Sequence, residues 1–262
     1  MTHPREHVGS NKTGVQMSPF DTGAMLDETN APVRGTPGDE TGLLHMRELY
    51  IHESDGIGSV PMPGTVKGMV SMGIDMLEGD RPQVLLDKLS ERLAFERTGT
   101  RLYDALLTKL DAAQDAAGSI SHALVAGIRD DEARHMLLAK EAIEAMGGDP
   151  TAQTPSADLA GVESHGLVQV LSDPRTSLAQ SLHAILTAEL SDNAGWEILI
   201  ALAWEHGQGD MVERFSEALQ LERRHLDLVQ TWYEEAIGLD GSIRPPDKVM
   251  PDMWEAPPGS TS

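Results

Sequence analysis

The chain of 262 residues contains no cysteine. Disulfides, thiolate zinc sites, cysteine-held iron–sulfur clusters and cysteine nucleophiles are therefore excluded. We therefore expect a metal site in this protein to use oxygen and nitrogen ligands, which carboxylates and imidazoles supply.

Basic residues and long apolar runs are also scarce. Only 20 lysines and arginines stand against 42 acidic residues, which gives a net charge of −22. This charge opposes binding to nucleic-acid backbones and to anionic membranes. The longest apolar run, Ile198 to Trp204, is too short to span a bilayer, and Met1 to Phe20 lacks the apolar centre of a signal peptide. We therefore expect a cytoplasmic protein without nucleic-acid or membrane partners.

Helical periodicity dominates what is present, and strand signals are nearly absent. Apolar residues make up 40% of the chain, which is enough for a sizeable core. Glycine and proline breaks divide the periodic part into four predicted helices, at residues 82–113, 120–146, 177–205 and 210–237. The fold class is therefore all-α.

Three regions follow from this division. Residues 1–81 form a partly disordered N-terminal extension, with short helices predicted over 43–51 and 66–77. Residues 82–238 form the helical domain, and residues 239–262 form an irregular proline-rich tail. Inside the domain, a long polar link over 149–176, with one apolar segment near 166–171, is long enough to cross the helices.

Two Glu-x-x-His motifs stand within the second and fourth predicted helices. Residues three apart share one face of a helix, so each motif can bind a metal ion. A single glutamate precedes each motif in the helix before it, 36 residues upstream in one half and 33 in the other. The candidate ligands are Glu96, Glu132, His135, Glu189, Glu222 and His225. The sequence thus predicts a dinuclear metal site made by two similar helical hairpins.

The candidate glutamates belong to apolar stripes. Leu182, Ile185 and Trp196 share a helix face with Glu189, so this carboxylate is expected to point into the core. Four buried carboxylates would repel one another unless cations neutralised them. Two divalent ions would do so, and oxygen and nitrogen ligands suit iron or manganese. The alternative is that the glutamates are half-exposed on helix surfaces and the histidines are ordinary core residues.

Neighbouring polar residues can orient the two histidines through their second ring nitrogens. The candidates for this role are Asp131, Asp192, Asn193 and Asp227. Protonation of the histidines should compete with metal below a pH of about 6.5, the ordinary histidine pKa.

With these ligands, the segment from Pro82 to Gly238 resembles the ferritin-like di-iron carboxylate superfamily, in which two helices each give a glutamate and two give Glu-x-x-His. Histidine in both halves is closer to bacterioferritin and rubrerythrin than to ferritin itself. The resemblance implies a four-helix bundle with a long crossover between its second and third helices. It also implies two iron ions, or manganese in their place, with Glu132 and Glu222 as bridging ligands.

Tyr103, seven residues after Glu96, resembles a tyrosine near the ferritin centre. The resemblance implies a catalytic role, in which it tunes the metal or donates an electron; the alternative is that it only packs. Without cysteine the chain has no rubredoxin-type module, so the electron donor stays unidentified.

Three functions fit these observations. The first is a di-iron or iron/manganese oxidoreductase that reacts with O2 or H2O2, alone or with a small organic substrate. The second is a ferroxidase and iron-storage protein, and the third is a metal-free helical scaffold or partner-binding module. A homo-oligomer is compatible with each of them.

Overall fold

The computed structural model describes residues 14–30, 39–62, 81–112 and 120–239. Every regular element in these ranges is helical, which confirms the all-α prediction. The chain divides into two compact units, with the boundary between Gly58 and Ser59. Within the described ranges, no helix combines the length and the apolar character that crossing a membrane requires.

The smaller unit contains a short 3-10 helix, η1 (Val15–Met17), and two α-helices, α1 (Pro19–Thr29) and α2 (Thr41–Glu53). Neither α-helix has a buried residue. The predicted helix over 43–51 is confirmed by α2, and the one over 66–77 lies outside the described residues. The sequence did not predict α1, which has too few apolar residues to show a periodic stripe.

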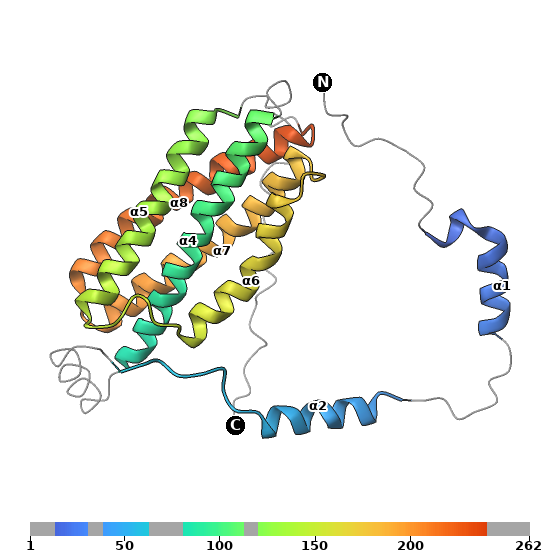
Figure 1. Cartoon of the computed structure of the whole chain (residues 1–262), viewed down its shortest axis with the longest axis horizontal. Helices are drawn as coiled ribbons and strands as arrows, with labels where there is room; N and C mark the ends of the chain where they lie inside the picture. Colours follow the sequence, from blue (N-terminus) through green and yellow to red (C-terminus); the bar gives the residue numbers. More distant parts are fainter. Residues whose placement is uncertain (1–13, 31–38, 63–80, 113–119, 240–262) are drawn as a thin grey trace, which may run out of the picture. The chain divides into compact units, whose positions relative to one another are not determined.

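Four long helices form most of the larger unit (Figure 1). They are α4 (Pro82–Ala112), α5 (His122–Ala145), α7 (Leu178–Glu205) and α8 (Gly209–Ala236). Their bounds agree with the four predicted ranges to within two residues. The predicted tail beyond residue 239 lies outside the described part of the chain.

Local chemistry determines where these helices begin and end. Pro82 stands in the first turn of α4, where its missing N–H is not needed. At the start of α7, the Ser177 hydroxyl accepts from the Gln180 N–H while the Gln180 side chain accepts from the Ser177 N–H. Gly147 after α5 and Gly238 after α8 have φ values of 81° and 83°, which glycine adopts without strain.

A fifth helix of this unit, α6 (Pro155–Ser172), was predicted only in part. The sequence predicted a polar link with one apolar segment, whereas the structure has an 18-residue helix here. Its buried side consists mainly of small residues and therefore lacks the large apolar periodicity that identified the other helices. These small buried residues are Ser156, Ala157, Ala160 and Ser164.

Hydrogen bonds hold α6 along α4 at both ends. Near the start of α4, Asp87 accepts from the backbone N–H and the hydroxyl of Ser156, at 3.0 and 2.7 Å. Near the end of α4, Lys109 Nζ donates to the carbonyls of Asp173 and Thr176, at 2.8 and 3.0 Å. The helix α6 therefore runs in the same direction as α4 and carries the chain along that helix before α7 begins.

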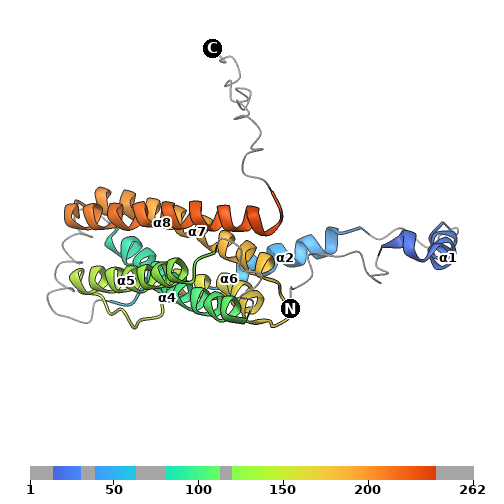
Figure 2. The same cartoon turned by 90° about the horizontal axis from the view of Figure 1, so that it is seen from above.

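The long helices pack as two pairs, α4 with α5 and α7 with α8, and the pairs face each other through α4–α7 and α5–α8 contacts. Figure 2 shows the α7–α8 pair lying over the α4–α5 pair. Two clusters of buried apolar side chains fill the interior. One includes Leu106, Val125 and Trp232, and the other includes Leu89 and Phe215.

A band of buried polar residues separates the two apolar clusters. On α4 it lies around Glu96, between Leu89 of one cluster and Leu102 of the other. On α8 it lies around Glu222, between Leu219 and Val229. The middle of the larger unit is therefore polar, and its two ends are apolar.

Candidate metal centre

All six predicted ligands belong to this polar band, and each long helix contributes at least one. Their exposed fractions are between 0 and 4%. The alternative of half-exposed surface glutamates is therefore excluded. The two Glu-x-x-His motifs lie on α5 and α8, and the single glutamates lie on α4 and α7, as the spacing predicted.

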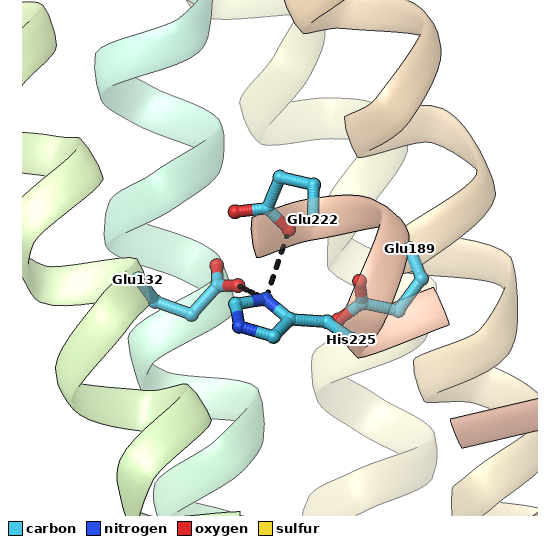
Figure 3. Close-up of side chains that lie close together, drawn as sticks. All are labelled: Glu132, Glu189, Glu222 and His225. Carbon is cyan, nitrogen blue, oxygen red and sulfur yellow. Dashed lines mark hydrogen bonds and ion pairs between the residues drawn. The ribbon is translucent and has the colours of Figure 1, made fainter. Parts of the chain in front are cut away.

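Two overlapping groups consist only of predicted ligands, and a third group also includes Asp192. In the first, Glu132, Glu189, Glu222 and His225 each place one ligand atom within 4.8 Å of those of the others (Figure 3). In the second, Glu96, His135 and Glu222 do the same. Because Glu222 belongs to both groups, the two potential ion positions are adjacent.

The His225 ring is fixed by contacts on both nitrogens. Its Nδ1 lies 3.1 Å from Glu222 Oε2 and 3.8 Å from Glu132 Oε1, as Figure 3 shows. Its Nε2 lies 3.2 Å from Asp131 Oδ2, on the neighbouring helix α5. Asp131 also forms an ion pair with Arg134. Of the four candidates that the sequence offered for orienting a histidine, Asp131 contacts His225.

The His135 ring also points its Nδ1 at carboxylates. This nitrogen forms a close contact with Glu222 Oε1 and lies 4.0 Å from Glu96 Oε2. The ring packs edge-on against Trp196, with centroids 5.6 Å apart. Burial, with His225 nearby, lowers the pKa of His135 to about 4. The imidazole is therefore neutral at pH 7, the form that binds metal, and its protonation falls well below the expected pH of about 6.5.

Burial and mutual repulsion disfavour the ionised forms of the four glutamates. Burial, with neighbouring carboxylates, raises the pKa of Glu96, Glu132 and Glu222 well above the ordinary value. Burial and Asp192 raise the pKa of Glu189 to about 8. Without a cation the carboxylates therefore cannot all ionise together near neutral pH.

Each glutamate also has one buried oxygen without a hydrogen bond. These oxygens are Glu96 Oε2, Glu132 Oε1, Glu189 Oε2 and Glu222 Oε1. His135 Nδ1 is buried without a hydrogen bond as well. Buried polar atoms are rarely left without a partner, so five such atoms in one band fit a site for a group that accepts electron pairs. A metal ion is such a group.

Tyr103 lies beside this cluster. Its side chain is 2% exposed, and its hydroxyl donates a hydrogen bond to Glu189 Oε1. Burial and the adjacent carboxylates raise the pKa of Tyr103 well above its usual value, so the phenol keeps its proton. The predicted catalytic role remains a prediction, although the residue touches a candidate ligand.

Arg92 is a further charged residue of the polar band, and the sequence did not predict its place there. Its guanidinium is buried, donates to Asp192 Oδ1, and lies 3.4 Å from Glu96 Oε1. The carbon at its centre also lies 4.8 Å from the ring centroid of Phe95 and 5.7 Å from that of Trp196. The signal was present, because Arg92 stands four residues before Glu96 in the same apolar stripe.

Asp192 proved different from its predicted role. It was a candidate for orienting a histidine, but it pairs with Arg92 and lies among the carboxylates. One of its oxygens is within 4.8 Å of ligand oxygens of Glu96, Glu132 and Glu222. Asn193 also acts differently, since its amide donates to the backbone carbonyls of Glu189 and Glu222, at 2.9 and 3.2 Å. It thereby ties α7 to α8 at the level of the centre.

Two helical glycines make room for these side chains. A Cβ at Gly99 on α4 would collide with the Glu132 carboxylate, and one at Gly195 on α7 would collide with the Arg92 guanidinium. Glycine destabilises a helix interior relative to alanine by about 1 kcal/mol. At both positions glycine lowers helix stability but leaves the space that a charged side chain needs.

The charges of the band fit two divalent cations. Five buried carboxylates, those of the four glutamates and Asp192, are opposed by the single guanidinium of Arg92. Four negative charges therefore remain when every carboxylate is ionised. Together with the two imidazoles, this donor set suits hard or borderline divalent cations.

No family model, curated protein or solved structure matches the chain. The chemistry of the centre is therefore inferred from its ligand types, its burial and its distances.

Proposed function

We propose that the larger unit is a ferritin-like four-helix bundle that holds two metal ions and acts as a di-iron or iron/manganese carboxylate oxidoreductase, with O2 or H2O2 as oxidant. The observation that carries this proposal is the convergence of four buried glutamates and two buried histidines, from four helices, with five of their polar atoms lacking hydrogen bonds.

The path of the chain supports the bundle assignment. The helix α6 would be the long crossover, because its hydrogen bonds to Asp87 and Lys109 run it along α4 from end to end. The pairs α4–α5 and α7–α8 would then be the two hairpins of the ferritin-like arrangement.

The groups of ligand atoms support an assignment for each ion. Glu189 and His225 would hold one ion, and Glu96 and His135 the other. Glu222 belongs to both groups, which favours it as a bridging ligand. Glu132 would be the second bridge, because it lies with the first group and also with Glu96.

Two bound ferrous ions would supply two electrons to O2 or H2O2. The chain's own residues would orient the groups that hold these ions. Asp131 fixes the His225 ring so that Nδ1 faces the carboxylates. Gly99 gives the Glu132 carboxylate its space. The apolar clusters on both sides of the band exclude water from the ligands.

Tyr103 holds a proton at the edge of the proposed centre. Its hydroxyl donates to Glu189 Oε1, so the phenol stabilises the ionised form of that carboxylate. It is also the oxidisable side chain that we propose for a catalytic role.

The decisive experiment is anaerobic loading with Fe2+, metal analysis and then exposure to O2 with measurement of oxygen consumption. We expect about two ions per chain and rapid oxygen uptake. Tens of ions per chain in a large particle would instead indicate iron storage. Absence of bound metal, with no change in melting temperature on adding Fe2+ or Mn2+, would indicate the metal-free scaffold.

Variants test the ligand assignment. Glu132→Ala and Glu222→Ala are each expected to lose both ions, because bridging carboxylates serve both positions. Glu96→Ala and Glu189→Ala are expected to retain one ion more readily. Glu144→Ala is the control, because Glu144 lies on α5 with its side chain 48% exposed. Full metal content in both bridging variants would contradict the assignment.

A further inference from the structure

Asp192 and Arg92 form a buried ion pair beside the six proposed ligands. Arg92 Nη1 donates to Asp192 Oδ1, and both side chains are 3% exposed. The same nitrogen lies 3.4 Å from Glu96 Oε1. One guanidinium is therefore shared between a proposed ligand and a carboxylate outside the six-ligand pattern.

Asp192 is buried and directs a carboxylate oxygen toward three of the proposed ligands. It follows Glu189 by three residues on α7 and so shares its inward face. One of its oxygens lies within 4.8 Å of ligand oxygens of Glu96, Glu132 and Glu222, and all four residues are buried. Glu96 Oε2 and Glu132 Oε1 are buried without a hydrogen bond, so both carboxylates have an oxygen that a cation could contact.

The Arg92 position is built into the fold. A side chain at Gly195 would collide with the guanidinium, which also lies near the rings of Phe95 and Trp196. Glycine is unfavourable inside a helix, but Gly195 leaves the space that the guanidinium fills. The fold therefore holds this positive charge at one side of the band.

The other side of the band presents the carboxylate of Asp131, which also pairs with Arg134. Asp131 Oδ2 lies 3.2 Å from His225 Nε2, and a carboxylate there favours a cation on the other ring nitrogen. The two ion positions thus have different surroundings, with a guanidinium beside Glu96 and a carboxylate behind His225.

We propose that Asp192 is a seventh metal ligand, that it serves the position of Glu96, the member of its group that is not shared between both positions, and that Arg92 holds it until that position fills. This inference rests on the proposed function. Without metal, the guanidinium neutralises Asp192. A cation at this position binds the Asp192 carboxylate in place of Arg92. Its binding is weakened by repulsion from the Arg92 guanidinium. The position of Glu189 and His225 therefore fills first.

Substitutions of Asp192 and of Arg92 should change the metal affinity of the Glu96 position in opposite directions. Asp192→Asn removes a ligand charge and weakens binding at the Glu96 position. Arg92→Met frees the carboxylate and removes a positive charge, so it strengthens binding there. A purely structural ion pair would behave differently, because loss of either member would disturb the same ligands and weaken binding.

The test is titration with Mn2+, in which the electron paramagnetic resonance signal of free Mn2+ reports binding. His225→Ala leaves the Glu96 position, and His135→Ala leaves the Glu189 position. In the His225→Ala background we expect Asp192→Asn to weaken binding at least tenfold, the lower end of the range for changes around a ligand. In the His135→Ala background the same change should weaken binding less than in the His225→Ala background, because Asp192 is not grouped with Glu189 and His225.

Asp131→Asn is the matched control, because it is the same chemical change on the other side. It should weaken binding in the His135→Ala background and leave the His225→Ala background nearly unchanged. Circular dichroism establishes that each variant is folded. If Arg92→Met does not fold, Arg92→Gln replaces it, since it keeps an amide donor for Asp192 without the charge, and tighter binding is again expected.

Two results would overturn the inference. One is an Asp192→Asn affinity equal to that of the parent in the His225→Ala background. The other is weaker binding in both the aspartate and the arginine variants. If the unaltered chain binds no Mn2+ at all, the proposed function fails first, and the two failures are thereby distinguished.

Discussion

At the scale of single residues, Gly99 shows how a missing side chain positions a charged one. This residue lies in the interior of α4, and the space that its Cβ would fill is occupied by the Glu132 carboxylate of α5. The position of a proposed bridging ligand therefore depends on a residue that binds nothing itself.

We predict that Gly99→Ala weakens Mn2+ binding by at least about tenfold, because the new methyl group displaces the Glu132 carboxylate. Gly127→Ala on α5 is the matched control, since a Cβ there meets no atom within 4 Å. The control should bind Mn2+ normally and gain about 0.5–1 kcal/mol of stability. Titration and thermal unfolding measure both quantities, and equal affinities in the two variants would contradict the prediction.

The sequence predicted the six candidate ligands because each Glu-x-x-His pair shares one helix face and a single glutamate precedes each pair at a similar distance. It could not show which way the rings turn, so Asp131 was one of four possible partners for a histidine. Arg92 was missed because a single arginine in an apolar stripe is usually a surface residue at the edge of the stripe. Only the packed structure shows that Gly195 leaves a space for it.

At the scale of helices, large side chains and end signals decided what could be predicted. The long helices carry leucine and isoleucine at helical spacing and end at residues such as Gly147 and Gly238, so their bounds followed from the sequence. The helix α6 has Ala157, Ala160 and Ser164 on its buried side. Small residues give little periodic signal, yet they let two helices approach closely.

We predict that Ala160→Leu destabilises the protein by about 1–3 kcal/mol, because three extra carbon atoms cannot fit on the buried side of α6. Ala160 is 3% exposed, whereas Val162 on the same helix is 69% exposed. Val162→Leu is therefore the control and should change stability by less than about 0.5 kcal/mol. Thermal unfolding compares them, and equal melting temperatures would show that α6 does not pack tightly.

At the scale of the whole molecule, stability depends on the charge state of the polar band. A carboxyl group with a raised pKa stabilises the folded state at low pH and loses this effect as the pH rises through its folded pKa. For Glu189 this window runs from 4.5 to about 8. His135 acts in the opposite sense, because its pKa falls from 6.5 to about 4 and its contribution is lost on acidification.

Four glutamates outweigh one histidine, so we predict that the metal-free protein becomes less stable as the pH rises from about 5 to about 8. Saturating Mn2+ should reduce this loss, because the ions neutralise the carboxylates. Melting temperatures with a chelator and with Mn2+ measure the effect. Glu189→Gln is the control and should flatten the metal-free curve. A metal-free melting temperature that rises over this interval would contradict the raised carboxyl pKa values.

The position of the polar band between two apolar clusters has a mechanical consequence. Each long helix crosses the band at mid-length, so repulsion there acts on all four helices in the same layer. We therefore expect the two ends of the domain to separate most easily at this layer, and neutralisation of its charges to couple the two ends more strongly. Binding of ions at the proposed centre would then also reduce local opening of the four helices.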